Sequence, residues 1–586
     1  MIKLLKNLRL KEWLMLVLCL GLIVVQVWLD LTMPDYMTEI TQLVQTEGSS
    51  LSSVWLAGGK MLLCALCSLV TAIVVCFIAS KVASTLSYRI RTQVYDKVTS
   101  FSAEEMKRFS TASLITRTTN DITQVQMVYS MAIQLLFKAP IMAVWAIIKI
   151  AGKGWQWSVA TACAVGILIV MLSIVIIFAV PRFKRIQKLT DKLNSATREN
   201  LTGVRVVRAY NAESYQEDKF DKVNSELTAN HLFTSRVMAI MQPGMTLISN
   251  GLTLAIYWIG AFLIHSADNM AKLTYFSNMI VYIQYAMMIV MSFMMLVMMF
   301  MMLPRASVSA KRINEILDTQ PCVVDGDKIA PQNRDGIVEF RNVSFKYPDA
   351  EDYVIKDVTF SANKGETIAF IGSTGSGKST LINLIPRFYD VTSGEILIDG
   401  MNVKDYTQKE LHNRIGYVSQ KAVLFSGTIE SNLKFGDNGQ SELSIEDMDE
   451  AVEIAQAKNF IYKLDDCYQH HVAQGGTNYS GGQKQRLSIA RAIARNPEIY
   501  IFDDSFSALD YKTDKALRKA LKKKSKDATT FIVAQRIGTI KDADKIVVLE
   551  DGNVVGMGKH KELLKSCQVY REIALSQLSK EELENA

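Results

Sequence analysis

The chain lacks any cysteine pattern typical of a disulfide framework. Its 586 residues contain eight cysteines, of which Cys64 and Cys67 form a C-x-x-C pair. That pair lies inside an apolar run and has no second pair of ligands, so small core residues are favoured over a metal or redox site. The other six are scattered singly: Cys19, Cys76, Cys163, Cys322, Cys467 and Cys567. These positions exclude an extracellular disulfide scaffold.

Charged residues are missing from five long runs in the first 303 residues. These runs contain no Asp, Glu, Lys or Arg: Trp13–Leu29, Met61–Ser80, Trp155–Pro181, Val237–Ile264 and Leu273–Leu303. About 20 apolar residues cross a bilayer as a helix, so the runs predict membrane spans. A sixth candidate, Ser130–Lys153, carries Lys138 and Lys149. Six spans place both termini on the same side of the membrane.

Basic residues are absent from the first predicted loop, Met33–Gly59. The amino terminus, by contrast, carries Lys3, Lys6, Arg9 and Lys11, and the segments 81–122 and 182–236 are rich in Lys and Arg. The positive-inside rule therefore predicts an external first loop and cytoplasmic termini. The first twelve residues mix apolar and basic positions and favour an interfacial helix over a cleaved signal, because the apolar run continues into a full span.

A glycine-rich phosphate-binding motif marks the second half of the chain. The sequence GSTGSGKS fits G-x-x-x-x-G-K-[ST], follows a strand-like run at 366–371, and precedes a helix-like run. Glycines let backbone N–H groups surround phosphates, Lys378 reaches the outer phosphates, and Ser379 offers a hydroxyl to Mg²⁺. The expected ATP-binding residues of the motif are Gly372, Ser373, Thr374, Gly375, Ser376, Gly377, Lys378, Ser379 and Thr380.

Two further features point to ATP chemistry. Asp503 ends the apolar strand-like run 499–502 and is placed to hold the Mg²⁺ that neutralises charge in phosphoryl transfer. The motif YSGGQKQR puts Ser480, Gly481, Gly482 and Gln483 at the start of a helix, where bare N–H groups and the helix dipole favour a second phosphate site. Alone, the second motif would indicate only a glycine turn before a basic helix.

Taken together, these motifs resemble the ATP-binding cassette (ABC) family. In that family two cassettes pair head to tail, so each ATP lies between one chain's phosphate loop and the other chain's signature. The resemblance implies that Gln420 in YVSQ links Mg²⁺ to the membrane domain and that Tyr347 in FKYP stacks on adenine, although a strand tyrosine is more often packing. It also implies that Asp510 in SALD belongs to the loop through which paired sites communicate.

The resemblance defines the expected fold: a six-helix membrane domain of the ABC exporter type joined to an α/β P-loop nucleotide-binding domain. We expect a membrane domain at 1–318, a linker at 319–334, the cassette at 335–580 and a tail at 581–586. Turns near Ala112–Arg117 and Arg208–Glu213 resemble coupling helices. The net charge of +7 is explained by cytoplasmic loops and nucleotide binding, and the basic run Lys519–Lys526 favours a solvated face over a nucleic-acid surface.

Two positions depart from the family pattern. Asp504 stands where the family has its catalytic glutamate, and Gln535 stands where a histidine switch is usual. These catalytic positions predict a chain that binds ATP and Mg²⁺ through Ser379, Gln420 and Asp503 but hydrolyses ATP poorly. The intact signature predicts a non-identical partner half-transporter carrying the usual glutamate and histidine.

The expected function is ATP-driven export of drugs or other amphipathic compounds across the cell membrane by such a heterodimer. A nucleotide-sensing regulatory subunit, or an exporter dedicated to a lipid or peptide, stays open as an alternative.

Methionine is concentrated in the last span. Ten methionines lie there: Met279, Met287, Met288, Met291, Met294, Met295, Met298, Met299, Met301 and Met302. They occupy every helical face, so simple packing and a flexible substrate-lining wall both remain open. Lys138 is the deeper of the two lysines in the sixth candidate span, and a buried cation marks a pairing partner or a solute route.

Overall fold

The computed structural model describes residues 1–46, 50–151, 154–329, 331, 334–437 and 443–578. It divides into two compact units. The first comprises Met1–Thr99 with Ala112–Thr319, and the second comprises Ser100–Thr111 with Gln320–Ala586. The predicted tail 581–586 lies outside the described residues.

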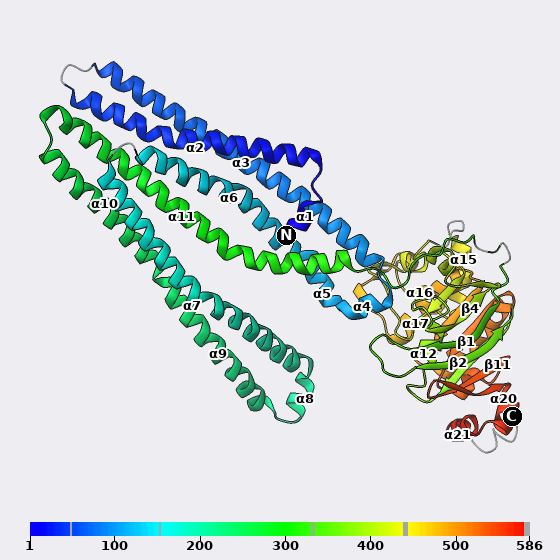
Figure 1. Cartoon of the computed structure of the whole chain (residues 1–586). Coiled ribbons are helices and arrows are strands. Elements are labelled where there is room, and N and C mark those ends of the chain that lie inside the picture. Colours follow the sequence, from blue (N-terminus) through cyan, green and yellow to red (C-terminus); the bar gives the residue numbers. More distant parts are fainter. Residues whose placement is uncertain (47–49, 152–153, 330, 332–333, 438–442, 579–586) are drawn as a thin grey trace. The chain divides into compact units, whose positions relative to one another are not determined.

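The first unit is helical throughout (Figure 1). Its elements are α1 (Ile2–Leu5), α2 (Leu10–Gln45), α3 (Leu51–Thr99), α5 (Thr111–Thr116), a π-helical turn (Arg117–Asp121), α6 (Ile122–Ala151), α7 (Trp155–Thr202), α8 (Val204–Ala209), α9 (Glu213–Ala239), α10 (Met241–His265) and α11 (Asn269–Asp318). Among the described residues, six helical stretches are long and apolar enough to cross a membrane, which confirms the six predicted spans. A helix suits this setting because it satisfies its own backbone polar groups in lipid.

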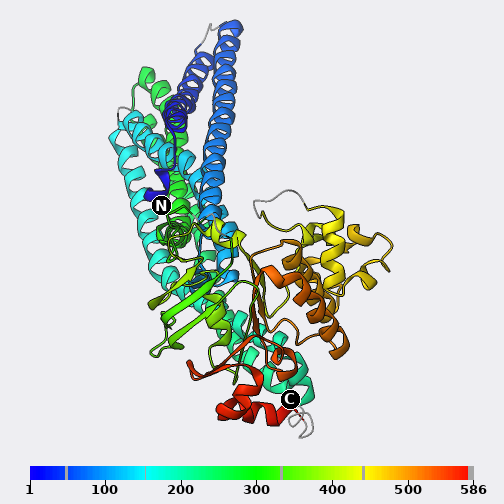
Figure 2. The same ribbon diagram turned by 90° about the vertical axis from the view of Figure 1, so that its right-hand side faces the viewer.

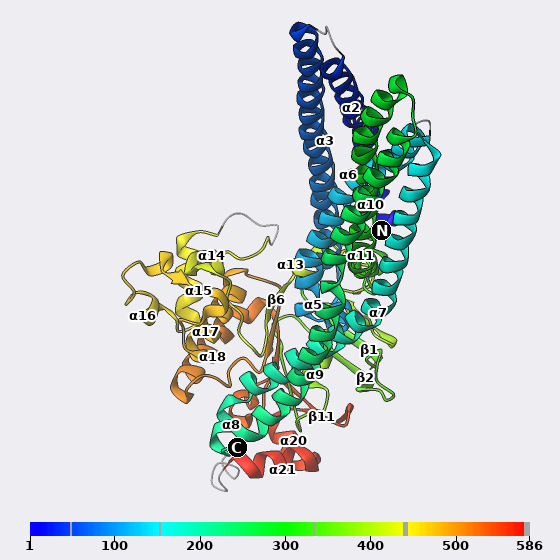
Figure 3. The ribbon, with the colours of Figure 1, turned by 90° about the vertical axis from the view of Figure 1, so that its left-hand side faces the viewer.

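The helices pack as long antiparallel neighbours. Helices α2 and α3 form one hairpin (Figures 1 and 2). Helices α7 and α9 form another, joined by the short α8 (Figure 3). The turn after α8 confirms the one predicted at Arg208–Glu213, since α9 begins at Glu213.

Three local predictions in this unit are wrong. The first loop, predicted as Met33–Gly59, is mostly helical, because α2 continues to Gln45 and α3 begins at Leu51. The apolar run, from which the span is predicted, ends before the helix ends. The break predicted near Ala112–Arg117 lies slightly earlier, at Ser110, whose φ of 56° ends the preceding helix. The predicted residues form the short helix α5 instead, and their role as a coupling helix stays a prediction. The break leaves a separate short helix, α4 (Ala103–Phe109).

The third error concerns the interfacial helix over the first twelve residues. Only the four residues of α1 are helical before α2 begins. Leu4 and Leu8 are buried within the unit instead of facing outward. Arg89 holds this segment by donating hydrogen bonds to the backbone oxygen of Asn7 at 3.0 Å and to the Glu12 carboxylate at 2.8 and 3.0 Å.

Both lysines of the sixth span are paired with aspartates on α2. Lys138 Nζ lies 3.1 Å from Asp30 Oδ2, and Ser68 also donates to Asp30 at 2.5 Å. Lys149 Nζ lies 2.6 Å from Asp35 Oδ2, and the other carboxylate oxygen of Asp35, Oδ1, accepts from the Tyr285 hydroxyl at 2.9 Å. The pairing alternative for Lys138 is therefore confirmed, and these bonds join α6 and α11 to α2.

The described methionine side chains among these ten residues of α11 fall into three groups. Met279 and Met299 are buried in the unit, whereas Met291 and Met298 are 56% and 58% exposed. Met287, Met288, Met294, Met295 and Met302 are half-buried. Because Met291 and Met298 are seven residues apart, they lie on one helical face. The side chain of Met301 lies outside the described side chains.

The second unit contains two main sheets. The antiparallel sheet has the order β2-β1-β4-β5, formed by β1 (Val338–Phe345), β2 (Ile355–Ala362), β4 (Ser393–Ile398) and β5 (Met401–Asn402). The six-stranded sheet has the order β12-β11-β3-β10-β9-β6, formed by β3 (Thr367–Gly372), β6 (Ile415–Val418), β9 (Ile499–Asp503), β10 (Thr529–Val533), β11 (Lys545–Glu550) and β12 (Asn553–Gly558). Strands β11, β3, β10, β9 and β6 are parallel, so the loops after them open at the same sheet edge.

Helices cover these sheets and extend from them. They are α12 (Lys378–Asn383), α13 (Gln408–Asn413), α14 (Ile429–Leu433), α15 (Ile445–Ile454), α16 (Lys458–Ile461), α17 (Gly481–Ala494), α18 (Tyr511–Lys524), α19 (Ile537–Ile540), α20 (His560–Ser566) and α21 (Gln568–Gln577). A small ribbon pairs β7 (Gly427–Thr428) with β8 (His471–Val472). Helices α14 to α18 gather to one side of β6 (Figure 3).

Helix α4 packs with the second unit, although it connects two helices of the first. Ser102 caps it, donating its backbone N–H to Glu105 at 2.7 Å. The other oxygen of the buried Glu105 carboxylate accepts from the backbone N–H of Cys322 at 2.8 Å. Lys107 places its ammonium 5.1 Å from the centre of the Tyr347 ring. This short helix, between α3 and α5 in the chain, is thereby fastened to the second unit.

The ion pair between Asp30 and Lys138 makes a stability prediction. Asp30→Asn or Lys138→Gln alone leaves the other charge unpaired in the membrane unit, and we expect each to cost on the order of 2 kcal/mol. The double variant Asp30→Asn with Lys138→Gln removes both charges and should recover most of the loss. Thermal unfolding in detergent checks this, with Lys60→Gln, which changes an exposed lysine of α3, as the control. Equal losses in all three Asp30 and Lys138 variants would contradict it.

Candidate functional site

The phosphate-binding motif has the strand–loop–helix context that its sequence predicts. The loop leaves β3 at Gly372 and enters α12 at Lys378. Gly377 has a φ of 94°, and a Cβ there would lie 2.7 Å from the Ile355 side chain. A Cβ at Gly375 would meet nothing within 4 Å. The loop is thus tight against the sheet at one glycine and open at the other, as a cradle for phosphate requires.

Lys378 folds over this loop. Its ammonium donates to the backbone oxygens of Gly372 at 2.9 Å and Ser373 at 2.6 Å, and to Ser376 Oγ at 3.3 Å. Burial lowers the pKa of Lys378, while the nearby Asp504 and Asp503 carboxylates act in the opposite direction. A cation held in this way over a glycine loop is suited to exchange its carbonyl contacts for phosphate oxygens.

Two of the three predicted Mg²⁺ ligands, Ser379 and Asp503, are in contact, while the third, Gln420, lies against Asp504. Ser379 Oγ donates to Asp503 Oδ1 at 2.8 Å, which brings the start of α12 to the end of β9. Burial raises the pKa of Asp503, and the bond from Ser379 opposes that shift. In the part of the chain that the structure describes, no three His, Cys, Asp or Glu side chains cluster as a metal site. Two oxygen ligands suit Mg²⁺, which takes its remaining ligands from water and substrate phosphates.

Asp504 is held by the amides of two glutamines. Its Oδ2 accepts from Gln535 Nε2 at 3.0 Å and lies 3.5 Å from Gln420 Nε2. Its backbone is also specialised, since φ is 45° and its N–H donates to the oxygen of Val533 at 3.0 Å. Burial raises the pKa of this carboxyl. The structure therefore joins three predicted residues, Asp504, Gln535 and Gln420, at one carboxylate.

The signature segment, Ser480–Gln483, starts α17. Ser480 Oγ accepts from the Gln483 N–H at 3.3 Å, and the Gln483 side chain accepts from the Ser480 N–H at 2.9 Å. Both Ser480 and Gly481 are exposed, and a Cβ at Gly481 would meet nothing within 4 Å. The helix thus presents an open N-terminus, the geometry expected of a phosphate site.

Tyr347 and Asp510 occupy structural positions near the expected site. The Tyr347 hydroxyl shares a 3.0 Å hydrogen bond with Thr380, and its ring meets Phe345 and Tyr389 edge-on. Asp510 caps α18 by accepting from the Thr513 N–H at 3.0 Å, and that bond lowers the pKa of Asp510. Adenine stacking and communication between sites stay predictions for these two residues.

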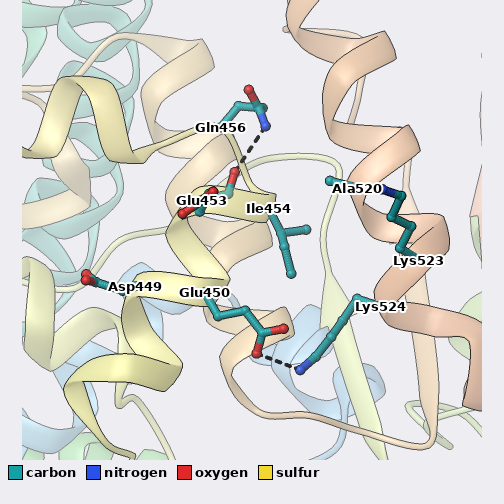
Figure 4. A pocket seen from close by; sticks show the side chains of 8 residues that line it. All are labelled: Asp449, Glu450, Glu453, Ile454, Gln456, Ala520, Lys523 and Lys524. Carbon is teal, nitrogen blue, oxygen red and sulfur yellow. Dashed lines mark hydrogen bonds and ion pairs between the residues drawn. The ribbon is translucent and has the colours of Figure 1, made fainter.

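A pocket of about 680 Å³ lies between α15 and α18 (Figure 4). Its lining residues are Asp449, Glu450, Glu453, Ile454, Gln456, Ala520, Lys523 and Lys524. Lys524 pairs with Glu450 at 2.7 Å across it. The pocket contains none of the predicted site residues, and its opposed charges do not form a catalytic arrangement.

Sequence reasoning missed Lys107, which lies over the Tyr347 ring. Only the general basic character of the segment 81–122 pointed to it. No local motif could connect a lysine between two membrane helices with a tyrosine more than 200 residues later.

Comparison with known proteins supports the reading of both units. Residues 16–293 match the model of the ABC transporter transmembrane region, and residues 355–507 match that of the ABC transporter. A relative described as an uncharacterized ABC transporter ATP-binding protein, from Mycobacterium bovis, is 38% identical over 86% of this chain and 85% of its own. The chain belongs to the ABC transporter family.

Other relatives carry more specific names. A Staphylococcus aureus protein, named as a candidate multidrug export ATP-binding/permease protein, is 34% identical over 85% of each chain. An ATP-dependent lipid A-core flippase of Syntrophus aciditrophicus is 31% identical over 85% of this chain and 81% of its own.

A solved structure extends the match to the whole fold. A bacterial Atm1-family ABC exporter with ATP bound superposes with a TM-score of 0.79, covering 97% of this chain and 99% of that chain at 24% identity. This ABC protein therefore has the exporter fold: six membrane-spanning helices followed by a nucleotide-binding ATPase domain.

Lys378 gives the most direct check of the ATP site. Lys378→Ala removes the ammonium that faces the phosphate loop and should weaken ATP binding to this chain by about 10- to 100-fold, the loss expected for a charged hydrogen bond. Titration with a fluorescent ATP analogue measures it. The control is Lys364→Ala, which removes an exposed lysine paired with Asp335. Equal affinity in the two variants would contradict the assignment.

Proposed function

We propose that this half-transporter is one subunit of a heterodimeric exporter, that its own ATP site is degenerate, and that the complex moves drugs or other amphipathic compounds out of the cytoplasm. ATP would draw the two cassettes together, and the resulting motion would turn the membrane cavity outward. Hydrolysis, mainly at the partner's phosphate loop, would reset it. Transport of this kind depends on ATP binding one conformation more tightly than another.

The geometry of Asp504 carries the proposal. Aspartate is one methylene shorter than glutamate, which withdraws the carboxylate from an attacking water by about 1 Å, and such a displacement can cost on the order of 100-fold in rate. The Asp504 oxygen that would act as a base already accepts from Gln535 at 3.0 Å. A carboxylate that is short and occupied in this way is poorly suited to activate water.

Gln535 weakens the site further. Its amide can donate a hydrogen bond to an outer phosphate, but it cannot become cationic as a histidine can. In addition, its Nε2 is engaged with Asp504. Stabilisation of the negative charge that develops during phosphoryl transfer is therefore reduced together with base catalysis.

The parts that bind ATP are intact, and this contrast supports a partner. Lys378 bonds the phosphate loop through Ser376, and Ser379 bonds Asp503. Ser480 and Gly481 present an open helix N-terminus. In the proposed complex, this signature completes the partner's ATP site, where a glutamate and a histidine perform hydrolysis. The partner's signature completes the site at Lys378 and retains ATP there.

The exposed face of α11 supports an amphipathic substrate. Met291 and Met298 lie on it, with Met287, Met294 and Met295 half-buried beside them. Flexible thioethers can repack around ligands of different shape. The name of the Staphylococcus aureus relative favours drug export, while the flippase name keeps a lipid substrate as a second candidate.

The proposed location is the cell membrane, with both termini in the cytoplasm. Six spanning stretches and the basic residues flanking them support this orientation. Helix α4, which is fastened to the cassette through Glu105 and Cys322, is then cytoplasmic, as the transmission of motion requires.

The two altered positions predict unequal ATP sites. In the assembled complex, Asp504→Ala should leave most of the steady-state ATPase intact, whereas removal of the partner's corresponding glutamate should nearly abolish it. Asp504→Glu alone should restore hydrolysis at this site only partly, because Gln535 stays neutral, and Asp504→Glu with Gln535→His should restore more.

Steady-state ATPase of the purified complex measures all four variants. A collapse on Asp504→Ala equal to that of the partner's variant would overturn the degenerate-site proposal. Full substrate-stimulated ATPase from homodimers of this chain alone would overturn the need for a different partner. ATP-dependent dye uptake into inverted vesicles separates an exporter from a regulatory subunit, which would show none.

The methionine face predicts a change in substrate range. Met291→Ala and Met298→Ala should alter the relative export of several dyes, since each ligand contacts the wall differently, while basal ATPase changes little. The matched controls are Met279→Ala and Met299→Ala, which open cavities in the packed interior and should lower thermal stability instead. A uniform effect of Met291→Ala and Met298→Ala on every dye, or none, would favour simple packing.

A further inference from the structure

The end of the last described helix reaches the loop that carries Gln535. This loop, Ala534–Ile537, follows β10 and leads into α19; we call it the switch loop. Gln577, the last residue of α21, accepts from the Ile537 N–H through Oε1 at 2.8 Å and donates from Nε2 to the backbone oxygen of Gln535 at 2.7 Å. One side-chain amide thus bonds the backbone on both sides of Arg536. We refer to these two bonds as the Gln577 bridge.

The bridge requires a side-chain amide. Its backbone partners are one donor and one acceptor, and only Gln or Asn offers a matching acceptor and donor on one planar group. The Ile537 N–H is also the first of α19, where no earlier helical carbonyl can satisfy it. The bridge therefore fixes the backbone of the switch loop where it would otherwise be least restrained.

The helix that carries Gln577 is anchored to the cassette. Tyr570 and Ala574 of α21 are fully buried in the main hydrophobic core of the unit. The Tyr570 hydroxyl also shares a 2.6 Å hydrogen bond with His560 of α20. Gln577 thus extends from a packed element, and the switch loop is held against the body of the cassette.

The same loop residue connects the bridge to the ATP site. The backbone oxygen of Gln535 accepts from Gln577, and its side chain donates to Asp504 at 3.0 Å. Movement of the Gln535 backbone would therefore move the amide that contacts the carboxylate at the catalytic position. We propose that Gln577 is a positioning residue for the ATP reaction: it sets where the side chain at position 535 points.

The inference rests on the proposed role of Gln535 at the phosphate switch. One arm of its test is therefore independent of that role. In the assembled complex, Gln577→Ala removes both bonds, and Gln577→Glu keeps an acceptor for Ile537 but removes the donor to Gln535. Gln568→Ala is the matched control, because Gln568 lies on the same helix and its side chain donates to Glu572 of that helix.

The first arm measures amide hydrogen exchange in a peptide covering the switch loop. Gln577→Ala should speed exchange there at least tenfold, Gln577→Glu less, and Gln568→Ala should leave it unchanged. Unchanged exchange in Gln577→Ala would overturn the bridge, whatever the fate of the degenerate-site proposal.

The second arm measures positioning in the Asp504→Glu, Gln535→His background of a complex whose partner lacks its corresponding glutamate, so that the remaining hydrolysis comes from this chain's own ATP site. Adding Gln577→Ala should lower kcat about tenfold with little change in KM, since ATP binding depends on other residues. If that background gains no hydrolysis, the degenerate-site proposal has failed. Positioning is then measured as the rate of ATP release from this chain, and Gln577→Ala should raise that rate severalfold. Faster exchange with unchanged kcat, or unchanged release, would show a purely structural bond and overturn the inference.

Discussion

The hydrogen bond from Gln535 to Asp504 depends on the parallel pairing of β9 and β10. Val533 lies opposite Asp503 in that ladder, so the residues that follow the two strands emerge side by side at one edge of the sheet. The neighbouring strand β3 delivers the phosphate loop to the same edge, and β6 delivers Gln420. A single sheet edge therefore collects the groups that bind ATP and the groups that would hydrolyse it. In this chain the residues at the hydrolytic positions are altered: Asp504 is shorter than glutamate, and Gln535 is neutral. The residues of the phosphate loop are all present.

Buried charged side chains are compensated differently in the two units. In the cassette, Lys378, Asp503 and Asp504 are buried close together, an arrangement whose cost a bound nucleotide and cation would relieve. In the membrane unit, Lys138 and Lys149 are paired with Asp30 and Asp35, and these ion pairs join α6 to α2. Helix α4 is continuous in sequence with the membrane helices and fastened to the cassette by Glu105.

Features that depend on local sequence were predictable. The phosphate loop, the strand ending at Asp503 and the helix opened by Ser480 each carry their own glycines, apolar runs or caps, and the structure has them in the expected context. Hydropathy located six spans, but it could not locate helix ends, because polar residues beyond the apolar core continue α2 to Gln45. Contacts between distant segments were not predictable. The Asp30 partner of Lys138 and the approach of Gln577 to the switch loop are set by tertiary packing, for which a single sequence carries no periodic signal.

The central claim is that ATP stays intact at this chain's own phosphate loop while the complex turns over. Photo-crosslinking of the working heterodimer with azido-ATP, labelled in separate samples on the α- or the γ-phosphate, tests it most directly. If the site is degenerate, this chain retains both labels during turnover, whereas the partner retains the α label and loses the γ label. Loss of the γ label from this chain at the same rate as from its partner would contradict the account.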